Sequence, residues 1–373
     1  MSSADTTRQP TPVSTFGTGL EPAELQNELV RKRYLKEEKV GEGTYAVVYV
    51  GKQIDTNIKI AIKKIKVGPA DQAKNGIDLS AIREIKLLRE LRHENIIHLL
   101  DVFSQKQNLN LVLEFLDCDL EMLIRDRSII FSPGNVKAWM CMTLRGLLHC
   151  HDNFVLHRDL KPNNLLISPT GVLKLADFGL ARYHADTGPS ARMSNSVVTR
   201  WYRSPELLMG ARWYGTGIDI WSVGCIFAEL MLRVPYMASE TDLGQLDVIF
   251  RALGTPTEDE WPDMRKLPAY ETAMPRTTYP RQPLSGLFTA ASTDALDLLS
   301  RMLTFDPRKR PTSRECLLHP YFVNAPRPTR EDRLPRKGGG MERGGEVVRD
   351  LKRKADAKEN LGGRDKIARK LVF

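Results

Sequence analysis

The segment that most constrains the fold is a polar octapeptide enclosed by short apolar runs. It reads His157-Arg158-Asp159-Leu160-Lys161-Pro162-Asn163-Asn164, and Asp177-Phe178-Gly179 follows at loop distance. The runs at 154–156, 165–167 and 173–176 have the length and composition of short strands. A chain with this pattern presents carboxylates, an amide and a cation at strand ends, where functional sites commonly lie.

These side chains suit one kind of chemistry. Asp159 can accept a proton, Lys161 supplies positive charge, and Asn164 and Asp177 supply oxygen atoms. Phosphoryl transfer from a magnesium nucleotide to a hydroxyl group needs such parts and little covalent chemistry from the protein. Taken alone, each carboxylate could instead be an ordinary turn former.

Length and composition indicate a folded protein without a membrane span. The 373 residues suffice for one large or two medium domains, and no uninterrupted apolar run approaches about 18 residues. The polar N-terminus, rich in Ser, Thr and Pro, argues against a secretory signal. Five scattered cysteines without a C-x-x-C pair indicate reduced, mostly buried thiols of an intracellular protein. His149-Cys150-His151 could clip a metal, but a helix end is the favoured interpretation because further ligands are missing.

The net charge of +9 is concentrated at the C-terminus. Residues 327–373 hold 15 Lys and Arg against 8 Asp and Glu, which leaves +2 for the other 326 residues. The nearly neutral body argues against a large nucleic-acid-binding face, so nucleic acid is expected at most through the tail. The tail also carries Lys352-Arg353-Lys354, which suits nuclear import.

A glycine-bearing turn lies between two alternating segments near the N-terminus. Gly41-Glu42-Gly43-Thr44-Tyr45-Ala46-Val47-Val48 follows one strand-like segment and begins another. Such a turn lets backbone N–H groups approach phosphates. Because a strand follows it rather than a helix, a dinucleotide-binding fold is disfavoured.

A lysine and a glutamate downstream of this turn have the spacing of a functional pair. Ile60-Ala61-Ile62-Lys63 reads as a β-branched strand that ends in lysine. Apolar residues at helical spacing then predict a helix over 77–91, and Glu84 on this helix is the expected ion-pair partner of Lys63. Further helices are expected over 136–151, 218–232, 242–253 and 293–303, and a strand over 109–115.

In order, spacing and context these motifs resemble the eukaryotic protein kinases over residues 34–322. The resemblance implies an α+β, bilobal fold. A small lobe (34–116) would hold an antiparallel β-sheet with one main helix, and a larger, mainly helical lobe would span 117–322. We expect disordered extensions at 1–33 and 323–373.

The resemblance also implies roles for the matching residues. Asp159 would be the catalytic base, and Lys161 would steady the transferring group. Asn164 and Asp177 would hold Mg²⁺. Lys63 would grip the ATP phosphates, Glu84 would position Lys63, and Thr199 completes the catalytic set. The other positions expected to bind ATP are Val40, Gly41, Glu42, Gly43, Thr44, Tyr45, Ala46, Val47, Val48, Ala61, Leu113, Glu114, Leu116, Asp119 and Leu166. Glu206 would pair with Arg310, and Asp219 would brace the catalytic loop.

Within the family, the chain is most similar to the cyclin-dependent kinases. Among these it resembles the kinase of transcription factor IIH, which activates other cyclin-dependent kinases. The helix from Ile77 to Glu84 resembles a cyclin-binding helix, and Val197 to Glu206 matches an activation-segment exit. The resemblance implies a nuclear serine/threonine kinase with an H-type cyclin, a RING-finger assembly factor and the core of transcription factor IIH as partners. Its substrates would be RNA polymerase II C-terminal repeats and the activation segments of other cyclin-dependent kinases.

Regulation by phosphorylation is implied as well. Ser194 stands where the family's activating acceptor falls, and Arg83, Arg158 and Arg182 would anchor its phosphate. Tyr45 in the glycine turn matches an inhibitory site, with an unmodified shielding tyrosine as the alternative. Three other functions stay open at this point: a different cell-cycle kinase, a pseudokinase scaffold, and, disfavoured by the neutral body, a nucleic-acid-binding protein.

Overall fold

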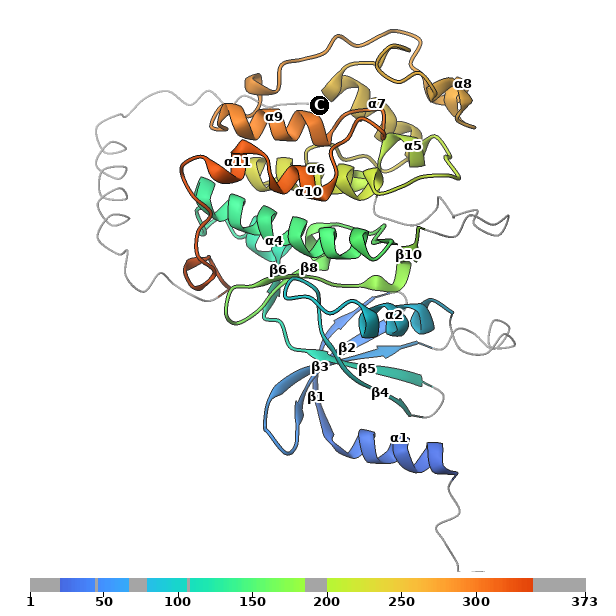
Figure 1. Ribbon diagram of the computed structural model, residues 1–373, viewed down its shortest axis with the longest axis vertical. Coiled ribbons are helices and arrows are strands. Elements are labelled where there is room, and N and C mark those ends of the chain that lie inside the picture. The colour runs from blue at the N-terminus through green and yellow to red at the C-terminus, as the bar shows by residue number, and fades with distance from the viewer. Residues whose placement is uncertain (1–20, 44–45, 67–78, 106–107, 185–199, 338–373) are drawn as a thin grey trace, which may run out of the picture. The chain divides into compact units, whose positions relative to one another are not determined.

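The computed structural model describes residues 21–43, 46–66, 79–105, 108–184 and 200–337. Their contacts divide the chain into two compact units (Figure 1). The smaller unit comprises residues up to Arg89 together with His98–Phe115, and the larger unit comprises Glu90–Ile97 and the chain from Leu116 onward. Residues 90–97, expected in the small lobe, thus group with the larger unit. The cause is local, because Ile97 N–H donates to Leu175 O and Asn95 Nδ2 to Leu173 O, both at 2.9 Å.

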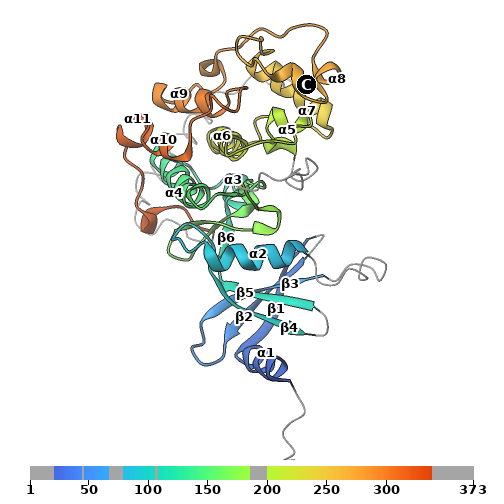
Figure 2. The ribbon, with the colours of Figure 1, turned by 45° about the vertical axis from the view of Figure 1, so that its right-hand side comes forward.

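The smaller unit is built on a five-stranded antiparallel sheet in the order β1-β2-β3-β5-β4. Its strands are β1 (Tyr34–Glu42), β2 (Ala46–Gln53), β3 (Lys59–Ile65), β4 (Leu99–Gln105) and β5 (Asn108–Glu114). Helix α2 (Leu79–Glu90) lies on the other side of the sheet from helix α1 (Pro22–Lys32) in both views (Figures 1 and 2).

Helix α1 corrects the expectation of disorder for residues 21–33, while the other part of that expectation, residues 1–20, lies outside the described residues. Pro22 begins the helix. Arg31 and Lys32 lie in its last turn, where their positive charge interacts favourably with the negative end of the helix dipole. Val30 is buried in the sheet core with Ile60 and Phe103. Asn27 and Ser104 exchange two hydrogen bonds, of 3.0 and 2.6 Å, between α1 and β4. Three apolar side chains in a charged window gave too weak a periodicity to predict this helix.

The larger unit is mainly helical. It contains α3 (Leu120–Arg125), α4 (Pro133–Asp152), α5 (Pro205–Leu208), α6 (Gly217–Leu232), α7 (Asp242–Leu253), α8 (Tyr270–Ala273), α9 (Thr293–Met302), α10 (Ser313–Leu317) and α11 (Pro320–Val323). Helix α6 is apolar almost all round and buried along most of its length. Figure 2 shows it nearly end-on, with α4, α5, α9 and α10 around it. None of the helices within the described ranges is long and apolar enough to cross a membrane.

Short strands of the larger unit carry the loops of the site. β6 (Cys118–Asp119), β8 (Leu165–Ile167) and β9 (Leu173–Leu175) form a three-stranded sheet, and β7 (Val155–Leu156) pairs with β10 (Arg182–Tyr183). A 3₁₀ turn at Pro162–Asn164 leads into β8, and another at Phe178–Leu180 follows β9. The predicted strands at 165–167 and 173–176 and the helix at 242–253 are therefore confirmed to within one residue at each end.

A strap of residues 324–337 corrects the second expectation of disorder, that for 323–373. Thr329 N–H donates to Gly134 O at 3.0 Å, and its hydroxyl donates to Asn135 Oδ1 at 2.9 Å. Leu334 is buried, and Arg336 donates to the carbonyl of Thr170. Gly171 has φ +91°, and a Cβ there would meet Glu331 O at 2.1 Å, so this close approach requires glycine. The rest of the predicted tail, 338–373, lies outside the described residues.

Candidate functional site

The glycine turn is closed by a backbone hydrogen bond and by contacts of charged side chains. Gly43 N–H donates to Ala46 O at 2.9 Å across the β1–β2 hairpin. The Glu42 carboxylate accepts hydrogen bonds from Lys39 and Lys66, which lower the pKa of Glu42 to about 2. Lys66 also donates to Gly43 O at 2.9 Å. Lys39 and Lys66 were not singled out from the sequence, and Thr44 and Tyr45 lie outside the described residues.

The predicted pair of Lys63 and Glu84 is confirmed. Lys63 Nζ lies 2.8 Å from Glu84 Oε1 and 3.0 Å from Oε2, with the two side chains 15% and 4% exposed. Lys63 is opposite Val48 on β2 and opposite Leu111 on β5. Because directly opposed residues share a face of a sheet, Lys63 and Val48 lie on one face.

The remaining expected ATP-binding positions of the smaller unit are spread along this sheet. Ala61 is opposite Leu113, so these two share a face as well. Ala46, Val47 and Leu113 are buried, whereas Val40 is exposed. Glu114 ends β5 and exchanges hydrogen bonds with His98, from Glu114 N–H to His98 O (3.1 Å) and from His98 N–H to Glu114 Oε1 (2.7 Å).

In the larger unit, two further expected positions come together. Asp119 and Leu166 are direct partners in the β6–β8 pairing. Asp119 also caps α3 by accepting from Met122 N–H at 2.8 Å. Burial raises the pKa of Asp119, against the lowering effect of this hydrogen bond. Leu116 immediately precedes this region as the first residue of the larger unit's second segment.

The loop at 157–164 holds Asp159 by one of its two carboxylate oxygens. Oδ2 accepts from Lys161 Nζ at 2.8 Å and from Asn164 Nδ2 at 2.9 Å. Oδ1 is buried and has no hydrogen-bond partner within the described part of the chain. A buried carboxylate oxygen without a partner is costly and needs an explanation. Among the described residues, this oxygen is thus an acceptor that is still available.

Asp219 on α6 holds the loop at 157–164 by accepting hydrogen bonds from its backbone. Its Oδ1 accepts from Arg158 N–H at 2.8 Å, and its Oδ2 accepts from His157 N–H and from His151 Nε2, both at 3.0 Å. Burial opposes ionisation of Asp219, but the hydrogen bond and charge of His151 and the other donors outweigh it and lower the pKa. The predicted brace is confirmed. His151, itself bonded to Ser313, is a member that the sequence did not reveal.

The two residues expected to hold a metal ion are linked through the backbone. Ala176 N–H donates to Asn164 O at 2.9 Å, so the residue before Asp177 is fastened to Asn164. Asp177 has left-handed backbone angles, with φ +64°, and its side chain is exposed. The Asn164 side chain donates from Nδ2 to Asp159, so the side-chain oxygen Oδ1 is directed away from Asp159.

Arg158 and Arg182 both act on the hydroxyl of Tyr214. Arg158 donates to Tyr214 Oη at 2.6 Å and to Leu180 O at 2.7 Å. Burial raises the pKa of Tyr214, while the charges of Arg158 and Arg182 act to lower it. Nε of Arg182 is buried without a partner among the described residues. Arg83 lies on α2, and Ser194 and Thr199 lie outside the described residues.

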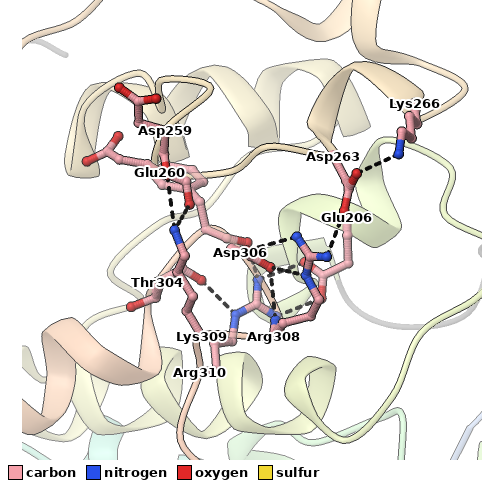
Figure 3. A network of polar contacts seen from close by, with 11 residues as sticks. Glu206, Asp259, Glu260, Asp263, Lys266, Thr304, Asp306, Arg308, Lys309 and Arg310 are labelled. Atoms are coloured by element: carbon pink, nitrogen blue, oxygen red, sulfur yellow. Dashed lines mark hydrogen bonds and ion pairs between the residues drawn. The ribbon is translucent and has the colours of Figure 1, made fainter.

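The predicted pair of Glu206 and Arg310 is confirmed as a buried, two-pronged contact. The guanidinium nitrogens lie 2.6 and 2.8 Å from the Glu206 carboxylate oxygens. Arg310 also donates to the carbonyl of Thr304 (Figure 3). It donates to the carbonyls of Phe305 and Gly217 as well. Such bidentate charge-assisted bonds fix geometry strongly.

The cysteines and the suspected metal clip have other partners. All five cysteines are free thiols, and four of them are buried. Burial raises the pKa of the Cys150 thiol, which keeps it protonated. His149 stacks on His93 with ring centroids 5.1 Å apart, while His151 binds Asp219. The three side chains of the clip therefore serve separate contacts.

Comparisons with known proteins agree with this geometry. The model of the protein kinase domain matches residues 34–322. The chain is 60% identical over 306 residues to serine/threonine-protein kinase crk1 of Schizosaccharomyces pombe, covering 82% of this chain and 89% of that protein. It is 55% identical to serine/threonine-protein kinase KIN28 of Saccharomyces cerevisiae (80% and 96%) and 50% identical to cyclin-dependent kinase 7 of Xenopus laevis (83% and 87%).

A solved structure is similar throughout. A chain of the CAK complex of Chaetomium thermophilum bound to ATP-γ-S matches with a TM-score of 0.79 and 50% identity, covering 84% of this chain and 98% of that one. The chain therefore belongs to the protein kinase family. It is a serine/threonine protein kinase, and its relatives place it with the cyclin-dependent kinases of the KIN28 and cyclin-dependent kinase 7 type.

Proposed function

We propose that Asp159 is the base that accepts the proton of a substrate serine or threonine hydroxyl when the phosphoryl group of ATP is transferred. The observation that carries this proposal is the buried Oδ1 of Asp159, which has no hydrogen-bond partner among the described residues. Lys161 and Asn164 occupy the other oxygen and so fix the orientation of the carboxylate. Lys161 stands beside the base and would also stabilise negative charge on the transferring group.

On the smaller unit, Lys63 would bind the nucleotide phosphates. The Glu84 carboxylate holds its ammonium group, which keeps a long, flexible side chain in one place. The hairpin turn from Gly41 to Ala46 would cover the phosphates with backbone N–H groups. Val48, Ala61, Leu113, Glu114, Leu116, Asp119 and Leu166 would line the site for the base and ribose.

Asn164 and Asp177 suit Mg²⁺ in their chemistry. Mg²⁺ prefers oxygen ligands and is commonly bound by one or two protein side chains together with substrate phosphates. When bound, the ion would neutralise phosphate charge, and the protein's part is to aim the two oxygens.

We further propose the substrates, the partners and the cellular location that the relatives suggest. The substrates would be the C-terminal repeats of RNA polymerase II and the activation segments of other cyclin-dependent kinases. An H-type cyclin, a RING-finger assembly factor and the core of transcription factor IIH would be the partners, in the nucleus. The support is the likeness to KIN28, to cyclin-dependent kinase 7 and to a chain of the CAK complex.

Phosphorylation of Ser194 would activate the kinase. Arg158 donates a hydrogen bond to Tyr214, the charge of Arg182 acts on the same side chain, and the buried Nε of Arg182 has no partner within the described ranges. A phosphate of about −2 charge would provide these cations with a counter-ion. Thr199 would complete the catalytic set, and Tyr45 would be a site of inhibition.

The experiment is a phosphotransfer assay on the chain purified with its endogenous partners, with polymerase repeats and an unphosphorylated cyclin-dependent kinase as substrates. Asp159→Asn and Lys63→Met should each lower kcat/KM by at least about a hundredfold, because each removes a group that acts in the transition state. Lys64→Met, the next residue on β3, is the matched control and should keep activity. Full activity in Asp159→Asn would refute the assigned base.

A further inference from the structure

The larger unit contains a cavity of 510 Å³ at a place that the kinase reaction does not use. It is enclosed by the end of α7, the segment 281–285, helix α9 and the turn at 303–309. Its volume lies in the range of sites for small organic ligands, about 300–1,000 Å³. Leu253, Leu303 and Phe305 give it a buried apolar floor, which Leu296 extends from α9.

The floor of the cavity is held in shape before any ligand arrives. Arg310 donates to Thr304 O at 2.7 Å, and Glu206 fixes the position of Arg310 (Figure 3). Arg310 also donates to Phe305 O at 3.0 Å. On the opposite side, a Cβ at Gly254 (φ +85°) would lie 2.9 Å from Arg281 Cα. The end of α7 and the segment 281–285 are therefore in close contact. A preformed pocket binds without first losing conformational entropy.

One cation on the rim differs from the others. Lys309 Nζ donates to the backbone carbonyls of Asp259 and Glu260, at 3.1 and 2.8 Å (Figure 3). Among the described residues no carboxylate lies within ion-pair distance of it. Its neighbours Arg308 and Arg310, in contrast, both contact carboxylates. An ammonium group has three N–H donors, so one remains for a ligand.

The other rim charges are already neutralised. Glu260 Oε1 lies 2.8 Å from Arg281, and Asp297 Oδ2 contacts both Arg301 and His319 at 2.9 Å. Because these groups are already paired with one another, none of them offers a second cation to a ligand. The rim therefore favours a single anionic group at Lys309 and disfavours a polyphosphate.

We propose that this cavity binds a small amphipathic monoanion. Its apolar chain or ring would lie on Leu303 and Phe305, and its carboxylate or sulfonate would bind the Lys309 ammonium. Burial of the apolar body would supply most of the affinity, and the charge-assisted hydrogen bond would select the anion.

The test uses the full-length chain with its nucleotide site saturated by a non-hydrolysable ATP analogue. The probe is 8-anilinonaphthalene-1-sulfonate, followed by its fluorescence and displaced by decanoate or by decanol. Saturable one-site binding is expected, with decanoate displacing the probe at lower concentration than decanol does. Lys309→Gln should weaken decanoate about tenfold, the equivalent of roughly 1.4 kcal/mol for one charge-assisted bond. Ser300→Trp, which fills the cavity from the exposed side of α9, should abolish binding.

Two variants serve as matched controls. Lys266→Gln removes a lysine that is 80% exposed and outside the cavity, and Ser300→Ala keeps the cavity open; both should bind like the original chain. Thermal unfolding verifies that each variant is folded. The proposal is overturned if decanol competes as well as decanoate and Lys309→Gln changes neither, or if Ser300→Trp binds the probe normally.

Discussion

The backbone N–H of Arg158 donates to Asp219 Oδ1 at 2.8 Å while Arg158 itself has a left-handed φ of +66°. Non-glycine residues adopt such angles at a cost of order 1–3 kcal/mol and keep them where surrounding contacts impose them. Asp219 is the contact that imposes it here. The orientation of the catalytic loop thus depends on a carboxylate more than fifty residues away in the sequence, buried in α6.

Replacing this carboxylate should both destabilise the larger unit and impair the loop. In Asp219→Asn the amide NH₂ would face one of the N–H donors, so we expect the free energy of unfolding to fall by about 2–4 kcal/mol. Urea denaturation measures it. Asp259→Asn is the control, at an exposed residue whose backbone carbonyl, but not its carboxylate, has a contact within the described ranges; it should change the free energy of unfolding by less than about 0.5 kcal/mol. Equal effects of the two substitutions would contradict the brace.

The pair of Glu206 and Arg310 should behave as a coupled unit. Glu206→Gln leaves a buried guanidinium without its counter-ion, for an expected loss of about 3–5 kcal/mol in the free energy of unfolding. The Arg310 guanidinium lies 4.9 Å from the ring of Trp221, so tryptophan fluorescence can follow the transition. In a double-mutant cycle with Arg310→Met, the double variant should lose clearly less than the sum of the single losses. Additive losses would show that the pair is not coupled.

Glu229 predicts a pH dependence of stability. It is 3% exposed and accepts a hydrogen bond of 2.7 Å from the Tyr202 hydroxyl. Burial, with repulsion from Glu121, raises the pKa of Glu229 above its ordinary 4.5, against the hydrogen bond from Tyr202. A carboxyl with a raised folded-state pKa stabilises fully below the unfolded pKa and loses this contribution as the pH rises through the folded pKa.

Glu229→Gln should therefore gain stability relative to the original chain as the pH rises from about 4.5. The amide oxygen can still accept from Tyr202, and no buried charge forms. Chemical denaturation at a series of pH values up to 8 measures the difference in the free energy of unfolding between the variant and the original chain. For the exposed control Glu24→Gln, this difference should not change with pH. A difference for Glu229→Gln that shrinks as the pH rises would reverse the assigned sign.

Helix α1 should be an integral part of the smaller unit. Val30→Asp places an unpaired charge among Ile60, Phe103 and Val112, and we expect the free energy of unfolding to fall by roughly 2–4 kcal/mol. Leu29→Asp, at the neighbouring position that is 50% exposed, should change it by less than about 0.5 kcal/mol. A similar small effect from both would mean that α1 does not pack on the sheet.

Sequence reasoning succeeded where the signal is local. The strands around the catalytic loop and helix α7 follow from apolar runs and periodicity, and the pairs of Lys63 with Glu84 and of Glu206 with Arg310 follow from motif order. These pairs also lie 21 and 104 residues apart, so for them the family pattern replaced the missing local signal.

The elements that were missed are stabilised by contacts distant in sequence. Helix α1 depends on Val30 and on the bonds between Asn27 and Ser104, 77 residues apart. Tyr214 meets Arg158 across 56 residues, and His151 meets Asp219 across 68. No periodicity or turn residue marks such contacts, because they appear only once the chain is folded.

The strap at 324–337 sets a lower limit on the fragment of this protein that can be cut out intact. A fragment ending at 322, where the match to the kinase domain ends, would leave the start of α4 without Thr329 and the hairpin at Gly171 without Glu331. It would also lose the buried Leu334. The folding unit is therefore longer than the family domain, and a fragment that keeps these contacts must include Arg336.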